Sequence, residues 1–156
     1  MRSDPSFNYS ITFWLYPRGP AIENWGSIFH YGDVDSVRAP AVWTLPGTYG
    51  LHCVLDAVSR SNMATTTPAL TQNVWGHIAL SVNTNKMLVY QNGLFVGQSD
   101  MTPHGGRKAY PTQKFYGGDN YPRTCRPWFT GGDCESGCLT GRVLTAGPLC
   151  RMQRRA

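Results

Sequence analysis

The stretch WGHIALSVNTNKMLVYQNGLFVGQ, residues 75–98, decides the fold class of this chain. Large apolar residues alternate with other residues along two runs of it, at Ile78, Leu80 and Val82 and again at Met87 and Val89. A period of two is the pattern of a half-buried β-strand. The dipeptide Asn92-Gly93 follows the second run and supplies the positive φ angles of a two-residue type I′ hairpin turn. The stretch therefore predicts two successive antiparallel hairpins.

Similar runs flank this stretch on both sides, and each ends at Gly, Pro or Asn. The expected strands cover residues 10–16, 26–32, 41–45, 51–57, 115–118 and 139–145. The polar, Thr-rich stretch 59–72 is expected to form a surface loop, and no segment shows a sustained helical period. About eight strands are enough for two packed sheets. The sequence therefore predicts an all-β, two-sheet antiparallel sandwich.

Length and charge restrict the domain organisation and the partners. With 156 residues and 41% hydrophobic content, the chain is expected to form one domain over residues 1–156. It has no apolar run of about 18 residues that would insert into a membrane. It also lacks the apolar stretch of a signal peptide, so we expect it to be one piece of a larger protein. The net charge is +5, but the basic residues form no dense stripe, so no nucleic-acid partner is expected.

The cysteines indicate an oxidising compartment. Four of them crowd a Gly-rich final quarter, where disulfides substitute for a hydrophobic core: Cys125, Cys134, Cys138 and Cys150. They allow three pairings, and their spacing lacks the paired C-x2-C knuckle of common zinc sites. Cys53 lies in a strand-like run and is expected to be a small buried hydrophobe. The sequon Asn8-Tyr9-Ser10 makes Asn8 a candidate glycosylation site. We expect an extracellular or cell-surface location.

The order of these segments resembles the concanavalin A-like lectin/glucanase superfamily, and in particular its laminin-G-like jelly-roll domains. The segments that carry the resemblance are SITFWLYPRG (10–19), WGSIFHYGD (25–33), VWTLPGTYGLHCVLDA (42–57), VWGHIALSVNTNKMLVYQNGLFVG (74–97), KFYGGDNY (114–121) and GRVLTAGPL (141–149). The similarity covers nearly the whole chain and implies a jelly-roll sandwich. A Cys- and Gly-rich insertion at about residues 120–138 departs from the family pattern.

Enzymatic activity is not expected. The hydrolases of that superfamily use two Glu residues close together around an Asp, because glycoside hydrolysis needs two neighbouring carboxyl groups. This chain has only Glu23 and Glu135, more than a hundred residues apart. The four histidines neighbour no Gly-x-Ser-x-Gly nucleophile motif.

Calcium is the cofactor that the resemblance implies, because laminin-G-like domains frequently hold Ca²⁺ at the rim of the sandwich. Four side chains in two loops carry suitable oxygen ligands: Asp33, Asp35, Asp119 and Asn120. The alternative is that an Asp beside a Gly stabilises a turn through hydrogen bonds to the backbone.

Two groups of loop residues are candidates for ligand binding. The first consists of aromatic residues whose rings could stack on a sugar: Trp25, Tyr49, Tyr121 and Trp128. The second is a cationic cluster of the kind that the family uses for sulfated or acidic glycans: Arg107, Lys108, Lys114, Arg123 and Arg126. The alternatives are aromatic rings buried in the core and an ordinary solvated loop. Trp14, Trp43 and Trp75 are assigned to the core or to a sheet surface.

These observations predict a non-catalytic recognition module that binds a glycan or a glycosylated protein through its rim loops. A function of another class remains open. The chain could instead be a structural β-sandwich module that contacts other chains in a cell-surface or filament assembly. Competition by soluble glycans would distinguish the two.

Overall fold

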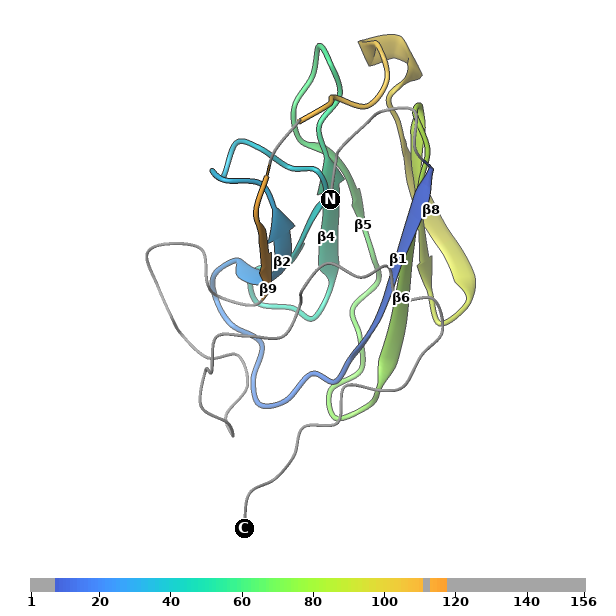
Figure 1. Ribbon diagram of the computed structural model, residues 1–156. Coiled ribbons are helices and arrows are strands. Elements are labelled where there is room, and N and C mark those ends of the chain that lie inside the picture. Colours follow the sequence, from blue (N-terminus) through green and yellow to red (C-terminus); the bar gives the residue numbers. More distant parts are fainter. Residues whose placement is uncertain (1–7, 111–112, 118–156) are drawn as a thin grey trace.

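The computed structural model describes residues 8–110 and 113–117, which fold into two antiparallel β-sheets packed face to face (Figure 1). In chain order the elements are β1 (Tyr9–Leu15), β2 (Gly26–Tyr31), β3 (Ala41–Thr44), β4 (Leu51–Leu55), β5 (Met63–Thr66), β6 (Gly76–Val82), β7 (Lys86–Gln91), β8 (Leu94–Asp100), the 3₁₀ helix η1 (Thr102–His104) and β9 (Phe115–Gly117). This arrangement confirms the predicted all-β, two-sheet antiparallel jelly-roll sandwich. The expected strand 139–145 lies outside the described residues.

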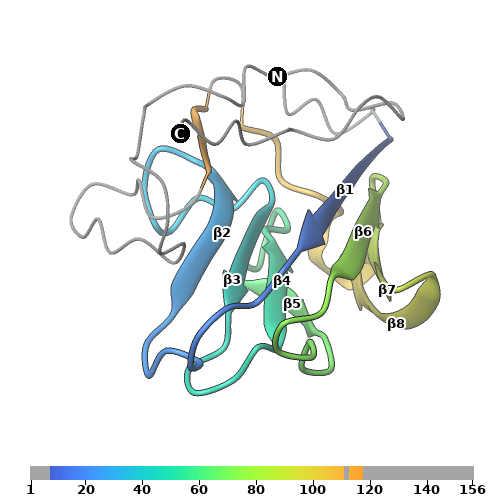
Figure 2. The same ribbon diagram turned by 90° about the horizontal axis from the view of Figure 1, so that it is seen from below.

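Each sheet has its own set of strands, and Figure 2 separates the two layers. The four-stranded sheet has the order β1-β6-β7-β8, and the five-stranded sheet has the order β5-β4-β3-β2-β9. Within residues 8–110 and 113–117, no helix is long and apolar enough to cross a membrane.

The predicted meander is present as β6, β7 and β8. Asn92 and Gly93 join β7 to β8 with φ angles of 52° and 80°, as a type I′ turn requires. The Asn92 side chain also accepts a hydrogen bond of 2.9 Å from the backbone N–H of His77 on the neighbouring strand. The two-residue turn therefore fixes the register of the hairpin and ties its tip to β6.

The core lies between the sheets and uses the alternate residues that the sequence pattern predicts. The four-stranded sheet contributes Ile78, Leu80, Val82, Met87 and Val89, and the five-stranded sheet contributes Phe29, Val42, Leu51, Cys53 and Leu55. Cys53 is fully buried, as predicted, and burial raises the pKa of its thiol to about 12. The thiol is therefore protonated and unreactive at neutral pH.

The prediction that residues 59–72 form a surface loop is wrong for Met63–Thr66, which form β5 beside β4. Thr residues are polar but β-branched, so they suit a strand at the edge of a sheet. The buried hydroxyl of Thr65 lies 2.9 Å from the hydroxyl of Ser99 on β8. This hydrogen bond joins the two sheets at that edge of the sandwich.

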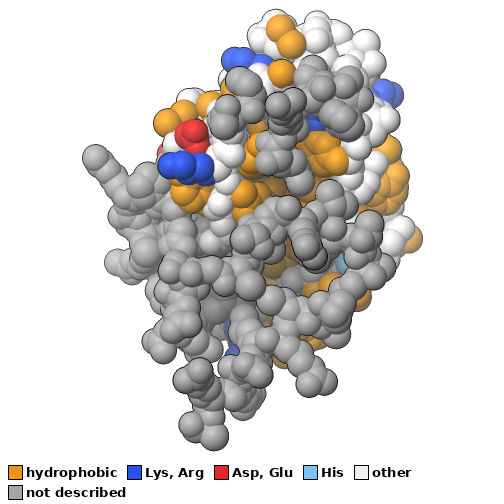
Figure 3. Space-filling model, in the orientation of Figure 1, with side chains coloured by type: hydrophobic (Ala, Val, Ile, Leu, Met, Phe, Trp, Pro, Cys, Tyr) orange, Lys and Arg blue, Asp and Glu red, His pale blue; other side chains and the backbone are white. Residues whose placement is uncertain are grey.

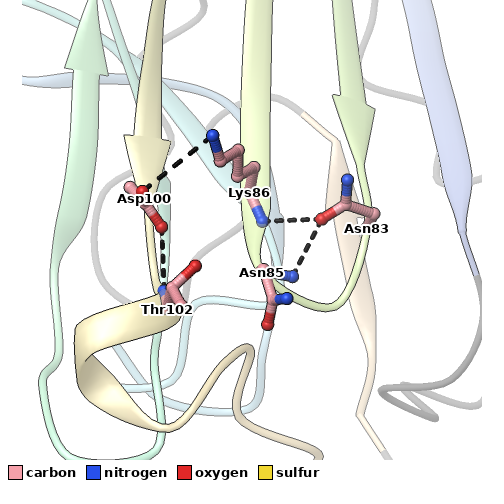
Figure 4. A network of polar contacts seen from close by, with 5 residues as sticks. All are labelled: Asn83, Asn85, Lys86, Asp100 and Thr102. Carbon is pink, nitrogen blue, oxygen red and sulfur yellow. Dashed lines mark hydrogen bonds and ion pairs between the residues drawn. The ribbon is translucent and has the colours of Figure 1, made fainter.

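Polar contacts close the end of the four-stranded sheet (Figure 4). The Asn83 side chain accepts the backbone N–H groups of Asn85 at 2.8 Å and Lys86 at 2.7 Å, which shapes the turn between β6 and β7. Asp100 accepts the backbone N–H of Thr102 at 2.9 Å and lies 4.0 Å from the ammonium of Lys86. This exposed network holds the chain where it leaves β8 and enters η1.

Candidate functional site

The structure places the predicted ligand-binding residues at two opposite ends of the sandwich. Trp25 immediately precedes β2, and Tyr49 lies in the turn between β3 and β4, at the same end. Lys114 lies at the other end, where its carbonyl accepts the N–H of Gly32 just after β2. Since β2 has six residues, the two ends are roughly 20 Å apart. These rim residues therefore do not form one continuous site.

Two of the predicted ligand-binding residues have structural contacts instead. Tyr49 packs against the core, and its hydroxyl donates a hydrogen bond to the carbonyl of Gly19. Arg107 is only 3% exposed, and its guanidinium lies 4.9 Å from the centre of the Tyr9 ring. The expectation that Arg107 belongs to an exposed cationic cluster is therefore corrected, because burial over an aromatic ring removes it from the surface. Lys108 and Lys114 are exposed, as a binding role would require.

The first pair of predicted calcium ligands, Asp33 and Asp35, is exposed in the loop after β2. The Asp33 carboxylate accepts the backbone N–H of Lys114 at 2.9 Å, and the Asp33 N–H donates to the Gln113 side chain at 2.8 Å. In residues 8–110 and 113–117, no three His, Cys, Asp or Glu side chains cluster as metal ligands. Asp33 thus joins the loop after β2 to the segment before β9 through long-range hydrogen bonds, rather than through the local turn bond of the alternative. Calcium binding stays a prediction.

Asp119, Asn120, Tyr121, Arg123, Cys125, Arg126, Trp128, Cys134, Cys138 and Cys150 lie outside the described residues. Asn8 is described and exposed, and its glycosylation stays a prediction.

The most prominent group of ring side chains on the five-stranded sheet lies on its outer face, which is turned away from β1 and β6 (Figure 2). We call Trp25, His52, Trp43 and His30 the aromatic row. The Trp25 ring lies 5.1 Å from the His52 ring, which lies 6.2 Å from the Trp43 ring. The His30 ring meets the Trp43 ring edge-on at 5.3 Å. More than half of the Trp25 side chain is exposed, so this end of the row is open to a ligand.

Strand pairing explains why these rings meet. Trp43 on β3 is paired with His52 on β4, and paired residues point to the same face of a sheet. On the other side of β3, a bulge in β2 shifts the register between Ser27 and Phe29. The extra residue turns Phe29 into the core and His30 to the outer face, although both follow Ser27 closely in sequence.

A cation lies at one end of the aromatic row. The guanidinium carbon of Arg38 is 5.6 Å from the centre of the Trp43 ring, a distance suited to a cation–π contact. Arg38 belongs to the loop that joins β2 to β3. Its backbone N–H donates a hydrogen bond of 2.9 Å to the carboxylate of Asp56, and its carbonyl accepts the Asp56 N–H at 3.0 Å.

The carboxylate of Asp56 holds the loops at the Arg38 end of the aromatic row. Asp56 is 1% exposed, and its carboxylate also accepts the Asn62 N–H at 2.9 Å and the Tyr110 hydroxyl at 2.8 Å. Buried carboxylates are tolerated only when their oxygens are hydrogen-bonded. Asp56 therefore ties three segments together around Arg38. Burial and the neighbouring carboxylate raise the pKa of Tyr110 well above its ordinary range, so its hydroxyl stays protonated and donates.

The histidines of the row are neutral at pH 7. Burial lowers the pKa of His52 below its ordinary value, and the nearby Arg38 charge lowers it further, against a raising contribution from Asn62. Burial likewise lowers the pKa of His30, whose Nε2 lies 2.5 Å from the carbonyl of Val37. The row is thus a set of uncharged rings with the Arg38 guanidinium at one end. Such a surface can stack on an apolar ring face and attract an anion.

The outer face of the four-stranded sheet is different. It carries large side chains that are exposed or half-buried, and we call it the apolar face: Trp14, Tyr16, Trp75, His77, Tyr90 and Phe95. Trp14 and Trp75 thus lie on the sheet surface, one of the two places predicted for them. Figure 3 shows hydrophobic side chains along the right-hand edge, over the hairpin between β7 and β8. Exposed apolar patches of this kind often mark contact surfaces.

Sequence reasoning missed His30, Arg38 and His52 as site residues and treated Trp43 as a core or surface residue. One signal in the sequence could have identified Trp43 and His52 as neighbours. The turn signal at residues 46–50 predicts a hairpin between two β-prone runs, and its register places Trp43 opposite His52. The position of Arg38 had no such signal, because the carboxylate that holds its backbone is 18 residues away.

Comparisons with known proteins agree with the fold. A family model described as the concanavalin A-like lectin/glucanases superfamily matches residues 2–132. The crystal structure of the botulinum neurotoxin serotype D binding domain is similar, with a TM-score of 0.54 and 16% sequence identity over 73% of this chain. The match covers 29% of that chain, and at this identity it shows the fold alone. No curated protein matches the sequence.

Proposed function

This chain belongs to the concanavalin A-like lectin/glucanases superfamily, and on that premise we propose that it is a non-catalytic recognition module for a glycan or a glycosylated protein. The aromatic row is the observation that carries the proposal. It replaces the rim loops as the centre of the site, because Trp25 is the one predicted stacking residue that the described structure leaves open.

The chemistry of the row suits a sugar. The C–H groups on one face of a pyranose ring carry a partial positive charge, and the face of an aromatic ring is negative. Trp25 and Trp43 both lie close to His52, so their ring centres are no more than about 11 Å apart. This spacing suits a short oligosaccharide that lies across the sheet face. Polar groups lie beside the rings. The side-chain oxygen of Asn62 is 3.4 Å from His52 Nε2, and Thr66 on β5 is paired with His52 on β4.

Binding of the oxidised full chain to an array of neutral and acidic glycans tests this proposal. We expect saturable binding that Trp25→Ala and Trp43→Ala each weaken, on the order of tenfold. Trp14→Ala and Trp75→Ala on the apolar face are the matched controls and are expected to bind as the wild type does. The absence of binding to any glycan, or equal loss in the control variants, would contradict the proposal.

Calcium dependence is tested by the same array with and without EDTA. Loss of binding in EDTA would support the predicted calcium site and an extracellular lectin. Binding that EDTA leaves unchanged would locate recognition in the aromatic row alone, without a metal.

The apolar face supports a second candidate function of another class. Three of its side chains, Trp14, Trp75 and Phe95, are more than half exposed. A structural module in a surface assembly would bury such side chains against a neighbouring chain. This function predicts tight contact between proteins that soluble glycans do not inhibit.

A further inference from the structure

We propose that the aromatic row selects acidic saccharides, with the Arg38 guanidinium pairing with a carboxylate or sulfate on a sugar that stacks on Trp43. This inference rests on the proposed function, because it names the class of glycan that the same site binds. It locates the recognition of charge on a sheet face rather than in the cationic rim segment that the sequence suggested.

The first argument is that the charge of Arg38 is available. Within residues 8–110 and 113–117, the carboxylate of Asp56 accepts the Arg38 backbone N–H at 2.9 Å and forms no ion pair with its side chain. In this part of the molecule, Lys86 and Asp100 form an ion pair at 4.0 Å, but Arg38 forms none within that distance. Its Nε is buried without a hydrogen-bond partner there. An arginine that lacks an acceptor is complementary to an oxyanion, because its planar fork offers several donors to one ligand.

The second argument is that Arg38 is held in place before any ligand binds. Its backbone is bonded to Asp56 in both directions, and its guanidinium lies over the Trp43 ring. A side chain that is already ordered loses little conformational entropy on binding. Its charge and the stacking surface of Trp43 are also adjacent, so one sugar residue can contact both.

The third argument concerns the surrounding charges. Tyr110 donates to the same carboxylate oxygen of Asp56 that accepts the Arg38 N–H. The ammonium of Lys108 lies 5.2 Å from the centre of the Tyr110 ring, which brings a second, exposed cation to this end of the row. The carboxylates of Asp35 and Asp56 also act on this end of the row: burial lowers the pKa of His30 and the Arg38 charge lowers it further, whereas the charges of the two carboxylates raise it. Lys108 therefore adds a second cation with which an anionic ligand on Arg38 could interact.

The test compares an oligogalacturonate with its methyl ester, which differ in charge but share the same rings. We expect calorimetry at low salt to show the acid binding on the order of tenfold more tightly, with a preference that shrinks at high salt. Arg38→Met keeps an apolar stem over Trp43, and it should abolish the preference while the ester binds as before. Arg38→Lys should retain part of the preference for the acid over the ester. A sulfated and an unsulfated oligosaccharide form a second pair that distinguishes the two anions.

Arg18 offers a matched control, because its guanidinium lies 5.7 Å from the Tyr16 ring on the opposite sheet. Arg18→Met should keep the preference for acid intact. Equal affinity for acid and ester in the wild type would overturn the inference and leave the proposed function standing. A preference that survives in a folded Arg38→Met variant would overturn it too. If neither the acid nor any neutral saccharide binds, both proposals fail.

Discussion

The two outer faces of this sandwich both carry aromatic rings, but among residues 8–110 and 113–117 polar loops are hydrogen-bonded together over the five-stranded sheet only. On the five-stranded sheet, the loop between β2 and β3 and the segment before β9 meet at Asp56. Ala41 and Val54, which share the outer face with Trp43 and His52, are fully buried. On the four-stranded sheet, Trp14, Trp75 and Phe95 remain more than half exposed.

The difference lies in what each face can recognise. Exposed rings without polar neighbours provide apolar contact area but do not orient a ligand. They suit a broad contact with another apolar surface. The aromatic row adds a fixed cation and polar neighbours, and these give orientation and selectivity to a small ligand. The buried carboxylate of Asp56 is hydrogen-bonded to these polar loops, so it is the first target for breaking the asymmetry.

Asp56→Ala is expected to have the largest effect. It would leave the backbone N–H groups of Arg38 and Asn62 and the hydroxyl of Tyr110 without their acceptor. Unsatisfied buried donors cost about 1–3 kcal/mol each, so we expect the free energy of unfolding to fall by roughly 3 kcal/mol. Urea denaturation followed by tryptophan fluorescence measures this change.

Asp100→Ala is the control for that experiment, because Asp100 is an exposed carboxylate that accepts one N–H at the end of the other sheet. It should leave the urea midpoint nearly unchanged. Equal effects of the two substitutions would show that Asp56 does not anchor the loops over the aromatic row.

The contrast between the faces also shows what the sequence could predict. The meander over residues 76–100 follows from a local code, since period-two alternation and Asn92-Gly93 act on neighbouring residues. The core position of Cys53 follows from the same alternation. The fold class and the exposed position of Trp25 were therefore accessible without a structure.

The arrangement of Arg38, Asp56 and Tyr110 could not be predicted, because its hydrogen bonds join residues 18 and 54 positions apart. Long-range hydrogen bonds leave no periodic trace in the sequence. Two further errors have similar causes. The edge strand β5 is Thr-rich and reads as a polar loop, and Arg107 reads as a surface cation although the fold buries it over Tyr9.

A pH titration of stability sharpens the comparison further, with a smaller expected effect. Burial lowers the pKa values of His30 and His52, both on the five-stranded face. In the unfolded chain, by contrast, histidine takes up a proton near pH 6.5. The unfolded state therefore binds more protons below that pH, so stability is full above about pH 6.5 and falls as the pH is lowered. Urea midpoints at pH 7.5, 6.5 and 5.5 should decrease in that order.

His52→Phe keeps a ring between Trp25 and Trp43 but cannot be protonated. It should reduce the loss of stability between pH 6.5 and pH 5.5, while the midpoint at pH 7.5 changes less. A variant whose midpoints fall as steeply as those of the wild type would show that burial of His52 does not contribute to the acid sensitivity.

The smallest effect on stability is expected on the apolar face, from Phe95→Ser combined with Trp75→Ser. Phe95 is 56% exposed, and the ring of Trp75 lies 5.2 Å from the ring of Tyr16 at the sheet surface. We expect the free energy of unfolding to change by less than about 1 kcal/mol, because exposed side chains contribute little to folding. If this face binds other chains, the same variant should reduce concentration-dependent association in sedimentation velocity while glycan binding stays as in the wild type. Loss of glycan binding in this variant would mean that the two faces act together, and the division of roles between them would be wrong.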